Sequence, residues 1–86
     1  MEVFYSSQFK KQYKALPKKV RNQFKKRLEM FFDDQINPQL HIHKLRGRYN
    51  GLHSMNVTGD IRALFDVSYK NSVLFVTIGT HSALYN

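Results

Sequence analysis

The chain has 86 residues, no cysteine and a net charge of +8. This length predicts a single domain over residues 1–86, and the lack of cysteine excludes disulfides and thiolate metal sites. No apolar run approaches the roughly 18 residues of a membrane span. The N-terminal residues lack the basic segment followed by an apolar run that is typical of a signal peptide. We therefore expect a cytoplasmic protein without a membrane partner.

The first half of the sequence predicts a strand followed by two helices. Residues 2–5 are β-branched and aromatic, which is typical of a strand, and Ser6 or Ser7 can cap a following helix. Pro17 ends that helix and begins a second, which we expect to run to Asn37-Pro38. Apolar residues recur at helical spacing: Phe9, Tyr13 and Leu16, then Val20, Phe24, Leu28, Phe31 and Phe32. These stripes predict a helical hairpin whose apolar side needs a sheet to cover it.

Basic residues are concentrated on these two helices. Nine of the fourteen lysines and arginines lie between Lys10 and Arg27, and no acidic residue lies between Glu2 and Glu29. Such a run is either a solvated helix face or a contact surface for nucleic acid or an acidic protein. The candidate contacts for RNA are Lys18, Lys19, Lys25 and Lys26.

The second half predicts four strands. Residues 41–48 and 52–57 flank Asn50-Gly51, a strong hairpin signal, although their apolar positions align poorly and indicate a bulge. Gly59-Asp60 and Asn71-Ser72 mark turns before strands at 61–67 and 73–78. The predicted fold is α+β, a two-layer β-α-α-β-β-β-β arrangement in which the helical hairpin packs on one face of a mostly antiparallel sheet.

The other face of the sheet is where we expect chemistry. Odd-numbered residues of the strand at 61–67 face the helices, so Asp60, Arg62 and Leu64 face the open side. His43 lies in the first arm of the hairpin, and His81 follows the last strand. Imidazoles transfer protons near neutral pH and guanidinium groups hold phosphate oxygens. These residue types could cleave a phosphodiester without a metal or another cofactor.

Three motifs together resemble the RelE/ParE toxin superfamily. They are His43-Lys-Leu-x-Gly, Gly59-Asp-x-Arg-x-x-Phe and Ile78-Gly-Thr-His. The chain looks most like the YafQ-type branch of mRNA interferases, from Phe4 to Tyr85. This resemblance implies a ribosome-dependent endoribonuclease that cleaves mRNA through attack by the 2′-hydroxyl group. It also implies a cognate acidic antitoxin that silences the toxin in an oligomeric complex.

The resemblance also implies roles for individual residues. His43 and Asp60 match residues near the attacking hydroxyl, either of which could be the general base, and His81 matches the general acid. Arg62 is placed to stabilise the phosphate. Lys44, Arg46 and Arg48 are further candidate RNA contacts, on spacing alone.

Ordinary structural roles compete with some of these assignments. Asp60 could be a turn residue to which Arg62 pairs, and we interpret His41 and His53 as surface or hydrogen-bonded polar residues. Asn56 stands where the YafQ-type branch often has a histidine, and His53 is three positions away from it. A metal site built on His41 and His43 lacks support from helical histidine spacing or from cysteines.

Two other functions fit the same sequence. A ParE-like toxin on this fold would inhibit gyrase by protein contact, and the fold alone does not separate it from a nuclease. A noncatalytic RNA- or protein-binding module would use the positive charge and need no proton-transfer groups. The set of His43, Asp60 and His81 favours the nuclease, because a contact inhibitor has no use for proton transfer.

Overall fold

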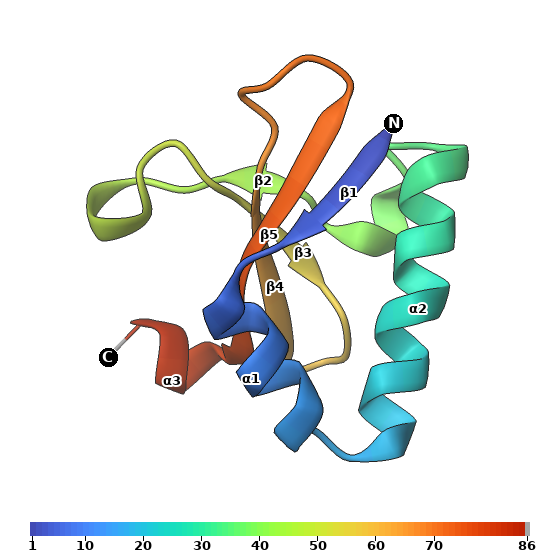
Figure 1. Ribbon diagram of the computed structural model, residues 1–86, viewed down its shortest axis with the longest axis vertical. Helices are drawn as coiled ribbons and strands as arrows, with labels where there is room; N and C mark the ends of the chain where they lie inside the picture. The colour runs from blue at the N-terminus through green and yellow to red at the C-terminus, as the bar shows by residue number, and fades with distance from the viewer. Residues whose placement is uncertain (86) are drawn as a thin grey trace.

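The structure, a computed structural model, describes residues 1–85. Its elements are β1 (Glu2–Tyr5), α1 (Ser7–Ala15), α2 (Lys18–Asp33), the 3₁₀ turn η1 (Pro38–Leu40), β2 (His43–Lys44), the 3₁₀ turn η2 (Gly47–Tyr49), β3 (His53–Asn56), β4 (Ile61–Asp66), β5 (Ser72–Thr80) and α3 (His81–Tyr85) (Figure 1). The sheet order is β1-β5-β4-β3-β2. β1 pairs with β5 in parallel, and the other neighbours pair antiparallel. The predicted α+β fold is therefore confirmed, with one additional helix, α3.

Local signals explain where the first helices begin and end. The Ser6 hydroxyl accepts a hydrogen bond from the backbone N of Phe9 at 3.0 Å and donates to the backbone oxygen of Val76 at 2.7 Å. It therefore caps α1 and ties that helix to β5. α2 ends at Asp33, earlier than predicted. An Asx turn follows directly, in which the Asp34 carboxylate accepts from the backbone N of Ile36 at 3.1 Å.

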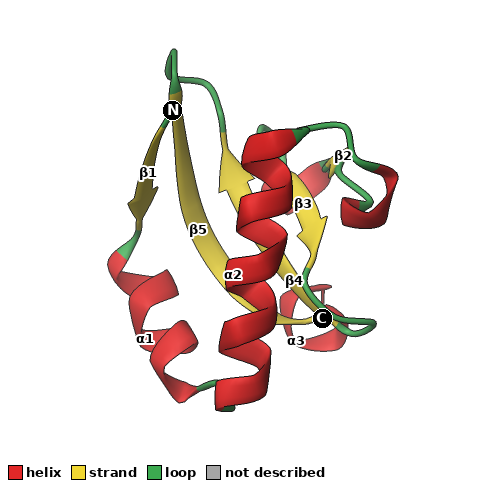
Figure 2. Cartoon of the chain, turned by 90° about the vertical axis from the view of Figure 1, so that its right-hand side faces the viewer, coloured by secondary structure: helices red, strands yellow, loops and turns green. Residues whose placement is uncertain are grey.

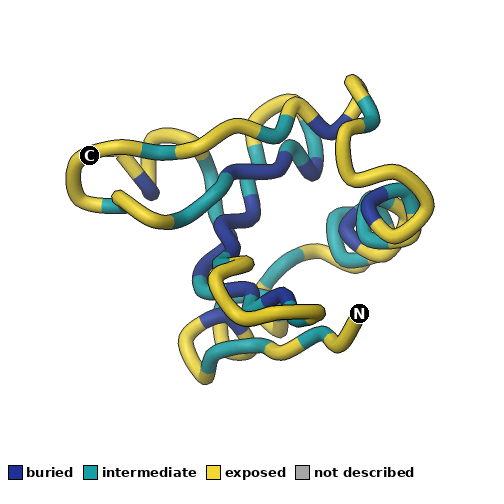
Figure 3. Tube along the Cα trace, turned by 90° about the horizontal axis from the view of Figure 1, so that it is seen from above, coloured by how far each residue is buried: buried dark blue, intermediate teal, exposed yellow. Residues whose placement is uncertain are grey.

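The hydrophobic core lies between the two long helices and one face of the sheet (Figure 2). The Phe24 ring of α2 lies 5.4 Å from that of Phe9 in α1 and 5.2 Å from that of Phe75 in β5. Buried residues are concentrated along the central strands (Figure 3). Phe32, which the helical stripe placed in the core, is 46% exposed near the end of α2.

Gln12 of α1 protects the edge of β5 where β1 has ended. Its side-chain oxygen accepts from the backbone N of Ile78 at 2.9 Å and from the Thr77 hydroxyl at 3.0 Å. Its amide nitrogen also lies 2.9 Å from the Thr77 hydroxyl. The helix thus supplies the hydrogen bonds that a neighbouring strand would give, which blocks further strand pairing at this edge.

The hairpin between β2 and β3 differs from the prediction. The strand expected over 41–48 is reduced to His43–Lys44, because His41 adopts a left-handed conformation with φ 49°. Asn50-Gly51 is not a two-residue turn: η2 intervenes, and the backbone N of Leu45 donates to the carbonyl of Leu52 at 3.0 Å. The bulge predicted in this hairpin is absent from the pairing of β2 with β3. A register shift occurs instead between Leu64 and Phe65, where β4 pairs with β5.

The second sheet face is less open than predicted. Leu64, expected on the open side, is fully buried. α3 and the loop containing η2 lie on the side of the sheet opposite α2 (Figure 1), and a Cβ atom at Gly79 would lie 3.7 Å from the Leu84 side chain. Val67, expected to face the helices, is 37% exposed because β4 ends at Asp66. No helix within residues 1–85 has the length and apolar character to cross a membrane.

Candidate active site

A hollow of about 470 Å³ lies on the sheet face opposite α1 and α2. We call it the sheet hollow. Its lining residues are His41, His43, Leu45, Ser54, Asn56, Arg62, His81 and Tyr85. Cross-strand pairing explains much of this set, since His43 pairs with Ser54 and Asn56 pairs with Arg62. Directly paired residues point to the same face of a sheet.

The sheet hollow brings together three of the four predicted catalytic residues. His43, Arg62 and His81 line it, whereas Asp60 does not. Asp60 is exposed in the turn before β4, and its backbone oxygen accepts from the backbone N of His81 at 3.0 Å. The Asp60 carboxylate has neither a hydrogen bond nor an ion pair with any residue in the described part of the chain, so the pairing with Arg62 is not formed.

His81 is positioned by the short helix that it begins. Its imidazole lies 4.8 Å from the ring of Tyr85, one turn further along α3. The Tyr49 hydroxyl of η2 donates to the backbone oxygen of Leu84 at 2.6 Å, and the Tyr49 ring meets Tyr85 edge-on at 5.7 Å. The loop containing η2 therefore fastens α3 against the sheet.

Arg48 takes part in the same attachment. Its guanidinium donates to the backbone oxygen of Leu84 and lies 4.9 Å from the centre of the Tyr49 ring. The sequence spacing that suggested an RNA contact did not reveal this structural role, because the role depends on the position of α3. The contact between Arg48 and RNA remains a prediction.

The contact made by His43 fixes which of its nitrogens can act as a base. Nδ1 of His43 lies 3.0 Å from the backbone oxygen of His41. A carbonyl oxygen can only accept, so this hydrogen bond requires a proton on Nδ1. In the neutral ring Nε2 then carries the free lone pair. The left-handed backbone of His41 belongs to the same local arrangement.

Arg62 is held by the turn between β3 and β4. Its Nη1 lies 3.2 Å from the backbone oxygen of Thr58, 3.1 Å from that of Gly59 and 3.4 Å from that of Ile61. Nε and Nη2 form no hydrogen bond with the described residues. The guanidinium is thus anchored through one nitrogen and keeps donors for an anion in the sheet hollow.

Sequence reasoning missed Ser54, Asn56 and Tyr85 as lining residues. Ser54 is fully buried, and its hydroxyl has no hydrogen-bond partner in the described region. A buried polar atom of this kind calls for an explanation, and a bound polar group would satisfy it. The signal in the sequence is the spacing of two between Ser54 and Asn56, which places both on one strand face. Only the pairing register between β3 and β4 shows that Arg62 lies on the same sheet face as Ser54 and Asn56.

The other predicted RNA contacts lie outside the sheet hollow. Lys44 pairs with His53, on the face opposite to His43, and Arg46 is exposed in the loop before η2. Four lysines are exposed on α2, on the far side of the sheet (Figure 1): Lys18, Lys19, Lys25 and Lys26. Within residues 1–85, no three His, Asp, Glu or Cys side chains are grouped to hold a metal ion.

The environment of His53 predicts that the free energy of unfolding depends on pH. Burial lowers its pKa from the usual 6.5, and the nearby charge of Lys44 lowers it further. Its ring stacks on Phe65 at 5.6 Å, and Nδ1 is buried without a partner in the described residues. Since the unfolded chain binds this proton more readily, the free energy of unfolding should fall as the pH drops from about 7 to about 5.

Denaturant unfolding at several pH values measures this effect. His53→Phe keeps an aromatic ring on Phe65 but cannot titrate, so its unfolding free energy should decrease less over the same pH range. An equal decrease in both proteins would assign the pH dependence to other groups.

Comparisons with known proteins identify the family and the fold. The family model described as "Bacterial toxin of type II toxin-antitoxin system, YafQ" matches residues 1–86. YafQ from E. coli strain BL21(DE3) superposes with a TM-score of 0.83 at 21% identity, over 99% of this chain and 98% of that chain. The E. coli DinJ-YafQ toxin-antitoxin complex gives a TM-score of 0.79 at 22% identity, over 99% and 97%. The RelB-RelE antitoxin-toxin complex from Methanococcus jannaschii gives a TM-score of 0.74 at 20% identity, over 95% of this chain and 94% of that chain.

These matches carry different weight. At such low identity the solved structures show the fold, which the present chain shares from end to end. The search of curated proteins found no match. The family model spans every residue, and the predicted resemblance to the YafQ-type branch is confirmed by it. The chain belongs to the YafQ family of bacterial type II toxin–antitoxin toxins.

Proposed function

We propose that this toxin is a metal-independent endoribonuclease that cleaves mRNA on the ribosome in the cytoplasm. The observation that carries the proposal is the meeting of His43, Arg62 and His81 in one hollow. These side chains supply a base, an anion-stabilising cation and an acid. A toxin that acts by protein contact would not need that combination.

The reaction requires two proton transfers. Nε2 of His43 removes the proton from the 2′-hydroxyl, whose oxygen then forms a bond to phosphorus. The bond between phosphorus and the 5′-oxygen breaks, and His81 in its protonated form gives a proton to that oxygen. The products are a 2′,3′-cyclic phosphate and a free 5′-hydroxyl. We assign the base to His43 rather than to Asp60, because the Asp60 carboxylate does not line the sheet hollow.

The transition state gathers negative charge on the phosphate oxygens. The free Nε and Nη2 donors of Arg62 can offset this charge, and their anchored position limits the reorganisation needed during the reaction. Asn56 lines the same space, and its side-chain amide can donate a hydrogen bond to the phosphate or ribose. Asn56 cannot transfer protons as a histidine would, so its role is to orient the substrate.

Charge distribution suggests how RNA and protein partners are divided between the two faces. We propose Arg46 and Arg48, in the loop around η2, as contacts to RNA phosphates. Lys44, on the edge strand β2 and on the face opposite to His43, is proposed as an RNA contact away from the scissile bond. The lysines of α2 on the far side face the ribosome or the antitoxin. YafQ has been solved with DinJ and RelE with RelB. By analogy with them and from the charge of +8, we propose a cognate acidic antitoxin in an oligomeric complex.

Primer extension on mRNA from cells that express the toxin tests the proposal. We expect cuts within translated codons, with 2′,3′-cyclic phosphate ends and no cuts when translation is blocked. Intact message together with DNA breaks would instead indicate gyrase inhibition. If both the mRNA and the DNA stayed intact, a noncatalytic RNA- or protein-binding module would be the remaining function. Either of these two results contradicts the nuclease assignment.

A further inference from the structure

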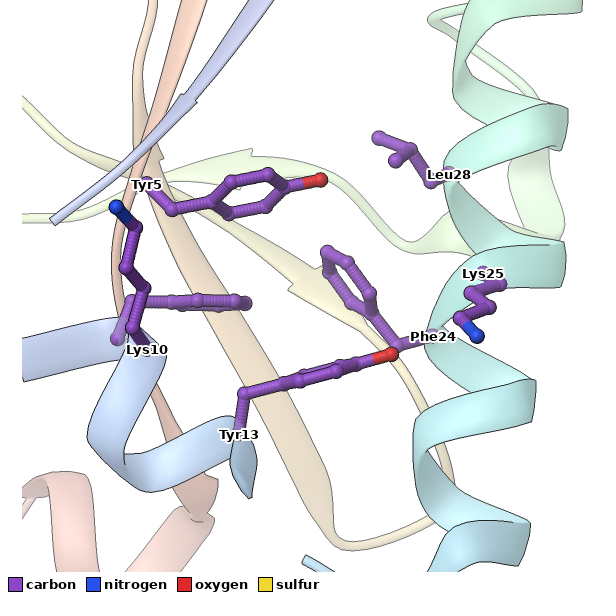
Figure 4. Close-up of a pocket in the computed structure, with 7 residues that line it drawn as sticks. Tyr5, Lys10, Tyr13, Phe24, Lys25 and Leu28 are labelled. Carbon is purple, nitrogen blue, oxygen red and sulfur yellow. The ribbon is translucent and has the colours of Figure 1, made fainter. Parts of the chain in front are cut away.

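A second pocket lies on the helix side of the sheet. It has a volume of about 280 Å³ between β1, α1 and α2, and we call it the helix pocket. It is lined by Tyr5, Phe9, Lys10, Tyr13, Phe24, Lys25 and Leu28. Figure 4 shows the rings of Tyr5, Tyr13 and Phe24 converging on the space, with Leu28 projecting towards it from α2.

The walls of the helix pocket are apolar and preformed. The Tyr5 and Phe9 rings stack at 5.2 Å, and Phe9 stacks on Tyr13 at 5.8 Å. Tyr13 is fixed further by its hydroxyl, which donates to the backbone oxygen of Arg21 at 3.1 Å. Protein interiors are normally close-packed. An apolar space of this size beside a well-packed core is therefore suited to an apolar group from outside.

The volume limits what that group can be. An apolar cavity of about 150 Å³ holds a benzene molecule, so the helix pocket has room for one aromatic or large aliphatic side chain. It lies at or below the small end of typical pockets for drug-sized ligands. Its walls also lack the several convergent polar groups that such ligands need.

The rim of the helix pocket is basic. Lys10 comes from α1 and Lys25 from α2. Glu29 lies one helical turn after Lys25, but within residues 1–85 neither lysine forms an ion pair. A second copy of this chain, also at +8, would meet the rim with like charge. A nucleobase would bind poorly, because the faces of the pocket rings already stack on one another and the walls offer few hydrogen-bond partners for the edges of the base. An acidic peptide segment with an apolar anchor fits both the walls and the rim.

We propose that the helix pocket binds an aromatic or large aliphatic side chain of the antitoxin, flanked by Asp or Glu residues that contact Lys10 and Lys25. This inference rests on the proposed antitoxin partner. It does not depend on RNA cleavage, because the pocket and the sheet hollow lie on opposite faces of the sheet. An anchor at this position would hold the antitoxin on the toxin independently of the catalytic groups.

Filling the pocket tests the proposal directly. Leu28→Trp places an indole in the space and, since the chain contains no other tryptophan, its emission reports whether the ring is buried. Titration calorimetry with the full-length antitoxin encoded beside the toxin gene should show affinity weakened by about tenfold or more, as for a buried anchor residue. Unchanged affinity with a buried indole would overturn the proposal.

A charge variant tests the rim without filling the core. Lys10→Glu/Lys25→Glu should weaken antitoxin binding by about tenfold or more. The control Lys11→Glu/Lys14→Glu changes the charge by the same amount, at exposed positions of α1 outside the pocket lining. Equal losses in the two pairs would indicate general electrostatic attraction and would refute the specific site.

RNA cleavage by the free variants separates the two proposals. Leu28→Trp, which changes no proposed RNA or ribosome contact, should cleave mRNA at the wild-type rate in the absence of antitoxin. If the rim variant loses cleavage but binds antitoxin normally, the pocket serves RNA and the inference fails. If the wild-type toxin does not cleave at all, the nuclease proposal fails, while the calorimetric comparison still decides the docking site.

Discussion

His81→Ala should slow mRNA cleavage by about 10²- to 10⁴-fold, the usual contribution of a group that transfers a proton in the transition state. The departing 5′-oxygen would have to take its proton from water. Single-turnover cleavage of one mRNA substrate by both proteins tests this expectation.

The fold should tolerate this substitution. The His81 side chain is exposed, and the hydrogen bond to the Asp60 carbonyl uses its backbone nitrogen, which alanine retains. The variant should therefore unfold close to the wild-type temperature and still bind the antitoxin. Ser82→Ala, an equally exposed neighbour on α3, is the matched control and should cleave normally. Full toxicity of the His81 variant would rule out its role as general acid.

The helices and the central strands were predictable because their signals are local. Ser6 and Pro17 mark helix starts, and apolar residues at helical spacing mark the side that packs on the sheet. The shortening of β2 was not predictable in this way, because the left-handed conformation of His41, which precedes that strand, depends on its surroundings. α3 has five residues, too few for a periodic pattern, and its attachment depends on distant contacts from Tyr49.

The sequence predicted which candidate residues lie together where a motif is tied to the sheet, and it did not where distant packing decides. His43, Arg62 and His81 meet as expected in the sheet hollow. Asp60 was expected beside Arg62, but it precedes β4, where the strand alternation no longer controls the side chain. Ser54 escaped notice because a serine within a strand has no distinctive pattern until its buried hydroxyl is seen without a partner.

The two proposed tasks lie on different faces of the sheet. The proposed proton-transfer groups lie on the side of α3, and the basic apolar pocket proposed for the antitoxin lies on the side of α2. A toxin that must be neutralised reversibly gains from this separation, because substitutions that adapt the antitoxin contact need not disturb the proton-transfer groups. The separation also makes the two sets of variants independent, since sites without shared contacts usually have additive effects.

Arg62→Ala should lower the cleavage rate by about 10²- to 10³-fold, as expected for loss of one preorganised donor to a developing charge. Arg62→Lys retains a positive charge but not the fork of donors, so we expect an intermediate rate. Single-turnover cleavage of one mRNA substrate by all three proteins gives this order. A rate for Arg62→Ala within threefold of wild type would contradict the phosphate-stabilising role.

The same substitution also removes contacts that hold the turn, so the catalytic effect needs a structural control. The Thr58 hydroxyl accepts from the backbone nitrogens of Asp60 and Ile61 at 3.3 and 3.0 Å, and Thr58→Val loosens this turn without removing the guanidinium. Each lost hydrogen bond should lower the free energy of unfolding by about 0.5–1.5 kcal/mol. Cleavage should fall far less than in Arg62→Ala. If both variants lost cleavage equally, Arg62 would act by holding the turn that carries Asp60. That turn also positions the start of α3, because the Asp60 carbonyl accepts a hydrogen bond from the backbone nitrogen of His81.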